Sequence, residues 1–93
     1  MIYAYVHMHL TDMTALAAYR EKAGAALAKH GGAVLSAAPQ PTALEGKLPL
    51  PDMAVILSFP DKEHALAWID DPELTAVHAL RQAAGDVSVI LIG

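Results

Sequence analysis

The sequence predicts a small α+β domain of ferredoxin-like architecture, in which a four-stranded antiparallel sheet has its helices on one face. The strand and helix patterns follow one another in the order β-α-β-β-α-β, the split βαβ arrangement of such domains. The length of 93 residues allows one hydrophobic core, so residues 1–93 are interpreted as a single domain. Both faces of the predicted sheet are apolar, which indicates that a second copy of the chain covers one of them.

The first part of the chain predicts a strand and a long helix. Residues 2–10 are rich in β-branched and aromatic side chains, which favour a strand. Thr11 and Asp12 offer an N-cap for an alanine-rich helix that reaches about Lys29. Gly31 can adopt the left-handed conformation that ends a helix.

The middle of the chain predicts two strands, a loop between them and a short helix. Residues 33–37 form the second strand, and the four prolines within residues 39–51 predict a loop. Residues 53–59 are a nearly continuous apolar run, which is typical of a central strand. A short helix follows over residues 60–69.

The end of the chain predicts a third helix and the last strand. Asp71 can cap a helix that has Pro72 in its first position and continues to Ala84. Gly85 ends that helix, and residues 87–92 form the fourth strand.

The third and fourth predicted strands are apolar on both faces. One face holds Met53, Val55, Leu57, Phe59, Val87, Val89 and Leu91, and the other holds Ala54, Ile56, Ser58, Ser88, Ile90 and Ile92. A sheet face that meets water is normally polar. We therefore expect a homodimer in which two sheets pack face to face.

Composition excludes several classes of partner. The net charge is −4 and the six basic residues never cluster, so we expect no binding to nucleic acid. No apolar run is long enough to span a membrane, and no signal peptide is visible, so we expect no membrane association. The chain has no cysteine, which excludes thiol catalysis and fits a cytoplasmic location.

Signature motifs of hydrolases and nucleotide enzymes are absent. The sequence contains no glycine-rich phosphate loop, no GxSxG elbow and no HExxH motif. We therefore expect no tightly held cofactor.

Two arginines lie on the apolar stripes of the predicted helices. Helical spacing places Arg20 in the stripe formed by Met13, Leu16, Ala23 and Leu27, and Arg81 in the stripe formed by Leu74, Val77, Leu80 and Ala84. An arginine directed toward the sheet can bind a carboxylate through its two-pronged guanidinium group. The more common interpretation is that each arginine extends to solvent or pairs with an acid such as Glu45 or Asp70.

The histidines and larger aromatic residues allow further interpretations. His7 and His9 project from one strand face and could bind a metal, but a metal site needs a third ligand and none is visible, so we favour core or interface histidines and predict no metal site. His30 can carry a proton if it lines a cleft, or it can simply stabilise a helix end. Trp68 and Tyr19 are core residues or the wall of a ligand pocket.

Several short motifs occur together along the chain. They are Tyr3-Ala4-Tyr5-Val6, Tyr19-Arg20, Lys29-His30-Gly31-Gly32, Leu44-Glu45-Gly46, Phe59-Pro60, Trp68, Asp71-Pro72-Glu73 and Arg81. In this order the motifs resemble the bacterial family called domain of unknown function 1330. Asp71 and Leu74 depart from the serine and tyrosine that this family usually shows there.

The resemblance implies the dimeric α+β barrel superfamily, in which two sheets pack face to face. That superfamily includes cofactor-independent monooxygenases, haem-degrading enzymes and muconolactone-type isomerases, which use a cleft between helices and sheet. No activity is assigned to the family itself, so the resemblance supplies no catalytic residue. Fold-level analogy says little about chemistry.

The sequence favours a dimer with a small, mostly apolar cleft in each subunit that binds an organic carboxylate or enolate. In this hypothesis Arg20 or Arg81 holds the anion, with Glu45 as a further contact. His30 moves a proton, and Tyr19 with Trp68 shapes the wall. The reaction would be an isomerisation or oxygenation. The alternative is a non-catalytic binding or stress-associated module whose cleft is filled by side chains, so the sequence leaves open whether the protein is an enzyme.

Overall fold

The computed structural model describes residues 1–93 and contains four strands, three α-helices and one short 3₁₀ helix. In chain order these elements are β1 (Ile2–Leu10), α1 (Met13–Ala28), β2 (Ala33–Pro39), β3 (Met53–Phe59), α2 (Lys62–Asp70), η1 (Pro72–Leu74), α3 (Thr75–Ala83) and β4 (Gly85–Ile92).

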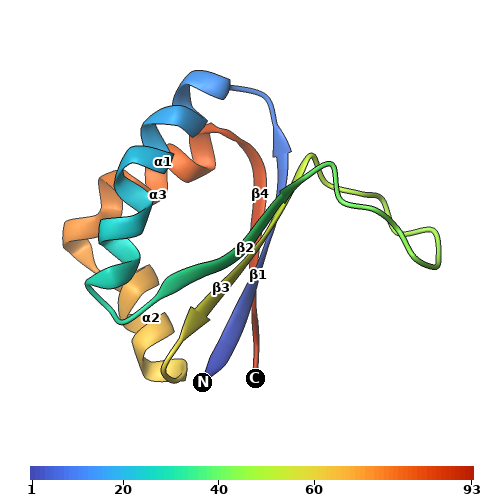
Figure 1. Ribbon diagram of the computed structural model, residues 1–93. Helices are drawn as coiled ribbons and strands as arrows, with labels where there is room; N and C mark the ends of the chain where they lie inside the picture. Colours follow the sequence, from blue (N-terminus) through green and yellow to red (C-terminus); the bar gives the residue numbers. More distant parts are fainter.

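The four strands form one antiparallel sheet with the order β2-β3-β1-β4. In the register of this sheet, Val6 of β1 lies between Val55 of β3 and Val89 of β4. All helices lie on one face of the sheet (Figure 1). The predicted ferredoxin-like α+β fold is therefore confirmed.

Strand alternation decides which side chains form the core. Ala4, Val6 and Met8 of β1 are buried beneath the helices, because successive side chains of a strand point to opposite faces. They meet Leu16 and Leu27 of α1 in a cluster of 13 buried hydrophobic residues. The core thus fills the layer between the sheet and the helices, and any cavity in this layer has apolar walls.

Capping residues begin and end the helices at the positions that the sequence indicates. The Asp12 carboxylate accepts hydrogen bonds from the backbone N–H groups of Thr14 and Ala15 at the start of α1. Gly31 follows the end of α1 with a φ of 71°, the left-handed conformation that glycine adopts without strain. Asp71 accepts a hydrogen bond from the N–H of Glu73 and caps η1.

The structure corrects three details of the prediction. The helix expected from Pro72 onward begins as the separate 3₁₀ turn η1, in which the Leu74 N–H group donates to the backbone carbonyl oxygen of Asp71. β2 extends to Pro39 and is interrupted by a bulge between Val34 and Ser36. Met13 is 62% exposed, because the first turn of α1 extends past the core.

Two apolar surfaces remain uncovered in a single chain. On the outer face of the sheet, Tyr3, Ile90 and Ile92 are exposed. The loop of residues 40–52 between β2 and β3 extends away from the sheet (Figure 1) and exposes Leu44 and Leu48. No helix of the chain combines the length and the hydropathy that a membrane crossing requires.

Candidate functional site

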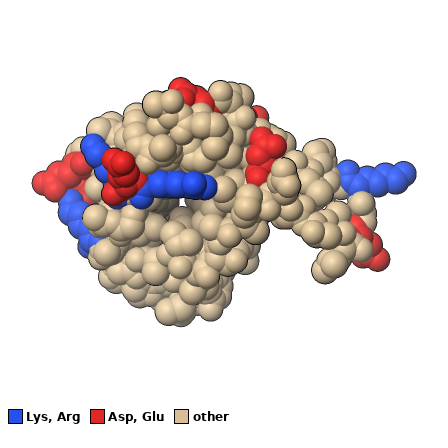
Figure 2. Space-filling model, turned by 45° about the horizontal axis from the view of Figure 1, so that its top comes forward, with Lys and Arg blue, Asp and Glu red and all other residues tan.

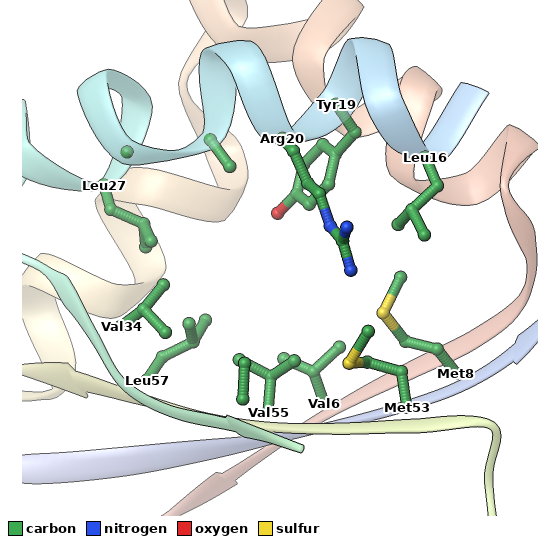
Figure 3. Close-up of a pocket in the computed structure, with 13 residues that line it drawn as sticks. Val6, Met8, Leu16, Tyr19, Arg20, Leu27, Val34, Met53, Val55 and Leu57 are labelled. Carbon is green, nitrogen blue, oxygen red and sulfur yellow. The ribbon is translucent and has the colours of Figure 1, made fainter. Parts of the chain in front are cut away.

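A cavity of about 290 Å³ lies between α1 and the strands β1, β2 and β3. A hollow beside a basic side chain is visible on the largely uncharged face shown in Figure 2. The lining residues, most of which are labelled in Figure 3, are Val6, Met8, Leu16, Tyr19, Arg20, Ala23, Gly24, Leu27, Val34, Ala37, Met53, Val55 and Leu57. The cavity is therefore an apolar pocket in which Tyr19 and Arg20 are the two polar side chains.

Arg20 lines this pocket but is exposed to solvent, so its positive charge lies at the border of the cavity. Its guanidinium group extends from α1 toward Met8 and Met53 on the sheet (Figure 3). Every ion pair of the chain belongs to Lys29, His30 or His64, so Arg20 has no acidic partner. Neither Arg20 nor Arg81 pairs with Glu45 or Asp70, so that part of the structural interpretation is wrong, whereas extension to solvent fits the exposed Arg20.

Arg81 is the second arginine of the region, and it lies behind the pocket. Its side chain is buried, with 3% of the residue exposed. Nη1 donates a hydrogen bond to Nδ1 of His78 over 2.8 Å and lies 3.5 Å from Oη of Tyr19. The guanidinium carbon lies 5.0 Å from the centre of the Trp68 ring and 5.7 Å from that of Tyr19. The direct polar and aromatic contacts of this buried cation are therefore neutral groups, and no carboxylate forms an ion pair with it.

His78 is held in its neutral form beside Arg81. Burial is the main cause that lowers the pKa of His78, and the positive charge of Arg81 lowers it further. Nε2 lies 2.8 Å from the backbone carbonyl oxygen of Trp68, which can only accept, so Nε2 carries the proton. Nδ1 is then free to accept the hydrogen bond from Arg81.

Tyr19 connects the two arginines. It lines the pocket beside Arg20, and its hydroxyl oxygen lies 3.5 Å from Nη1 of Arg81. Figure 3 shows its ring extending from α1 toward the space above the sheet. Tyr19 is therefore the pocket-lining residue that contacts the buried Arg81.

His30 lies apart from this pocket. Nε2 of His30 is 2.8 Å from a carboxylate oxygen of Asp71, and Lys29 binds the same oxygen. Hydrogen bonds from Lys29, and secondly from His30, hold the pKa of Asp71 well below its usual range. His30 lines an open surface hollow with His64 and is not among the residues that line the arginine pocket.

Trp68 belongs to a second apolar cavity, of about 230 Å³, beneath α2. Its ring lies 5.5 Å from that of Phe59 and 4.9 Å from that of His78. The cavity is lined by Ala4, Phe59, Ala65, Leu66, Trp68, Ile69, Val89 and Leu91, none of which is charged. Trp68 contacts Arg81 but does not line the arginine pocket. Glu45 lies in the exposed loop between β2 and β3 and does not line it either.

The two strand histidines contact each other on the outer face of the sheet. Tyr5 Oη lies 3.0 Å from Nδ1 of His7, and Nε2 of His7 lies 3.2 Å from Nε2 of His9. No group of three or more His, Asp or Glu side chains is close enough to hold a metal ion. The three side chains form a hydrogen-bonded row on the uncovered face.

His78 is the residue of this region that the sequence analysis missed. It precedes Arg81 by three positions on α3, which places the two side chains on one helix face. That spacing, together with the location of Arg81 in an apolar stripe, is a signal for a buried polar pair.

Fold and pocket together define a ferredoxin-like α+β domain with an arginine in an apolar cavity beneath its first helix. Comparison with known families is more specific. The chain belongs to the family described as Domain of unknown function (DUF1330), which matches residues 1–93. No curated protein matches the sequence.

Solved structures with the same fold are known. The RPA0582 protein of unknown function from Rhodopseudomonas palustris is 24% identical, with a TM-score of 0.80 over 98% of this chain and 79% of that chain. The methylated RPA0582 protein is 22% identical, with a TM-score of 0.75 over 98% of this chain and 78% of that one. At these identities the likeness establishes the fold alone.

Proposed function

We propose that the protein is a homodimer whose subunits each bind a small organic anion, with an apolar body, in the cavity between α1 and the sheet. The observation that supports this most strongly is Arg20, an arginine without an acidic partner that extends into an apolar cavity. Guanidinium groups bind carboxylates through charge-assisted hydrogen bonds, which are among the strongest in proteins.

The size and lining of the cavity fit such a ligand. Its volume of about 290 Å³ is close to the lower limit of roughly 300 Å³ for small-molecule sites. Eleven of its 13 lining residues are hydrophobic, so the body of the ligand would be buried against aliphatic side chains and thioethers. The alternative of a cleft filled by side chains is less well supported, because this cavity is open.

A catalytic role would depend on Tyr19. The pocket lining contains no Asp, Glu, His or Ser, and His30 is bonded to Asp71 outside it. Proton transfer in an isomerisation or a cofactor-independent oxygenation would therefore have Tyr19 as its acid or base. The proposal is thus a binding function first, with such chemistry as an extension that needs this hydroxyl.

The binding function can be tested by calorimetry with two probes of similar shape, octanoate and octanol. We expect octanoate to bind more tightly than octanol, and Arg20→Met to weaken octanoate binding about tenfold while leaving octanol binding unchanged. Lys22→Met is the matched control, since Lys22 is exposed on the same helix and does not line the cavity. Equal octanoate affinity in Arg20→Met and Lys22→Met would refute the proposal.

The dimer is proposed because one chain leaves large apolar groups in water. Ile90 and Ile92 of the outer sheet face are 55% and 54% exposed, and Leu44 of the loop is 98% exposed. A second sheet packed on this face, as in dimeric α+β barrels, would bury Ile90 and Ile92. Sedimentation of the protein at micromolar concentration as a 9.8 kDa monomer would refute the dimer.

A further inference from the structure

We propose that the Tyr19 hydroxyl is a second ligand-binding donor of the cavity, and that Arg81 is the positioning residue that polarises it toward a carboxylate. This inference rests on the proposed function and assigns its ligand class. It makes the anion a carboxylate shared between Arg20 and Tyr19, with the buried charge of Arg81 behind them.

The burial of Arg81 is the first step of the argument. Transfer of a cation from water to the protein interior costs several kcal/mol unless an anion or a set of hydrogen bonds compensates it. The side-chain hydrogen bonds of Arg81 come from Nη1, and their partners are the neutral groups of His78 and Tyr19. The aromatic faces of Trp68 and Tyr19 supply further attraction but no negative charge. An anion bound nearby would supply it.

The hydrogen-bonding state of Tyr19 is the second step. An N–H group of Arg81 faces its oxygen at 3.5 Å, the long end of the hydrogen-bonding range, so the oxygen is on the accepting side of this contact. This is the only side-chain hydrogen bond of Tyr19, and the phenolic proton has no acceptor in the protein. Tyr19 lines the cavity, and in this proposal its phenolic proton is donated to a ligand there.

The charges around the cavity favour the binding of an anionic ligand over a neutral one. Arg20 lies in the cavity and Arg81 lies behind its Tyr19 wall, and no acid pairs with either of them. A carboxylate has two oxygens, so one can accept from a guanidinium group while the other accepts from a phenol. A neutral alcohol of the same length would gain little from either arginine.

A double-mutant cycle on probe affinity tests this inference. Octanoate and octanol are titrated calorimetrically into the wild type, Tyr19→Phe, Arg81→Met and the double variant. We expect Tyr19→Phe to weaken octanoate binding about tenfold and Arg81→Met about threefold to tenfold. In the Tyr19→Phe background, Arg81→Met should have a smaller effect, because Arg81 acts through the missing hydroxyl. Octanol affinity should stay constant throughout.

The outcomes separate this inference from the proposed function. Octanoate binding that depends on Arg20, and is unchanged in Tyr19→Phe, overturns the inference and leaves the proposed function intact. Parallel losses of octanoate and octanol affinity would show collapse of the cavity and would also overturn it. Absence of octanoate binding to the wild type overturns both.

Discussion

Replacement of Arg81 by methionine should leave the free energy of unfolding almost unchanged, although only 3% of the arginine is exposed. Removal of the cation abolishes a burial cost of several kcal/mol. Against this gain, the variant loses a desolvated cation–π contact with Trp68, worth about 2 kcal/mol, and leaves Nδ1 of His78 without a donor, which costs about 1–3 kcal/mol. The terms nearly cancel, so we expect a net change within about 1 kcal/mol.

Urea unfolding at fixed protein concentration, without ligand, measures this change. Fixed concentration matters because a dimer is stabilised by mass action. Arg81→Ala serves as the comparison, since it also deletes the aliphatic stem and should be less stable than Arg81→Met by about 2–5 kcal/mol. If both variants have the same free energy of unfolding, packing of the aliphatic stem of residue 81 does not contribute to stability.

One result would refute the reasoning about Arg81. Breaking a buried ion pair by removal of one partner costs about 3–5 kcal/mol. A loss of that size in Arg81→Met would mean that a negative charge compensates the arginine in the folded protein, contrary to the neutral partners His78 and Tyr19. Arg81 would then be a structural residue, and its link to the ligand cavity would lose its basis.

Three further predictions concern assembly, acid stability and a close backbone contact. Ile90→Glu on the outer sheet face should convert the proposed dimer to a monomer in sedimentation, whereas Met13→Glu, at the exposed start of α1, should not. A persistent Ile90→Glu dimer would contradict the proposed sheet-to-sheet interface. Because its neighbours hold the pKa of Asp71 below the usual range in the folded state, its carboxylate stabilises the fold above about pH 4, and this contribution is lost as the pH falls. Asp71→Asn should therefore flatten the acid side of the stability profile, and an unchanged profile would contradict this. Gly85→Ala should lower the free energy of unfolding by at least about 2 kcal/mol, because its Cβ would lie next to a backbone carbonyl oxygen of β1. Gly24→Ala, with open space around its Cβ, should not, and equal effects of the two would contradict the contact.

The order of the elements could be predicted because each has a local signal. Alternating apolar residues identify β1 and β4, and the caps Asp12, Gly31 and Asp71 mark the helix boundaries. The exposure of Met13 could not be predicted in this way. Helical periodicity gives the direction of a side chain around the helix axis, but not whether the core extends as far as that turn.

The sequence predicts toward which side of a helix the two arginines point, but not which residues contact them. Periodicity directs Arg20 and Arg81 toward the sheet, and the structure buries Arg81, whereas Arg20 is exposed and borders the cavity. The difference depends on tertiary neighbours. Tyr19 and Arg81 are separated by 62 positions, and no local pattern brings them within hydrogen-bonding range. For the same reason the sequence could not show that His30 pairs with Asp71, 41 positions away, at a distance from the pocket.

The position of Tyr19 and Arg20 in adjacent places on α1 explains how one helix serves both the cavity and the buried cation. Successive helical residues point about 100° apart, so these two side chains leave the helix in different directions. Arg20 extends toward the thioethers of the sheet, whereas Tyr19 extends to the side where Arg81 of α3 lies, and both still border the cavity. The cavity lies between α1 and the strands β1, β2 and β3, and no residue of α3 lines it. In the proposed arrangement an anion in the cavity would meet Arg20 directly and Arg81 only through the Tyr19 hydroxyl, so Arg81 would not itself need to reach the cavity.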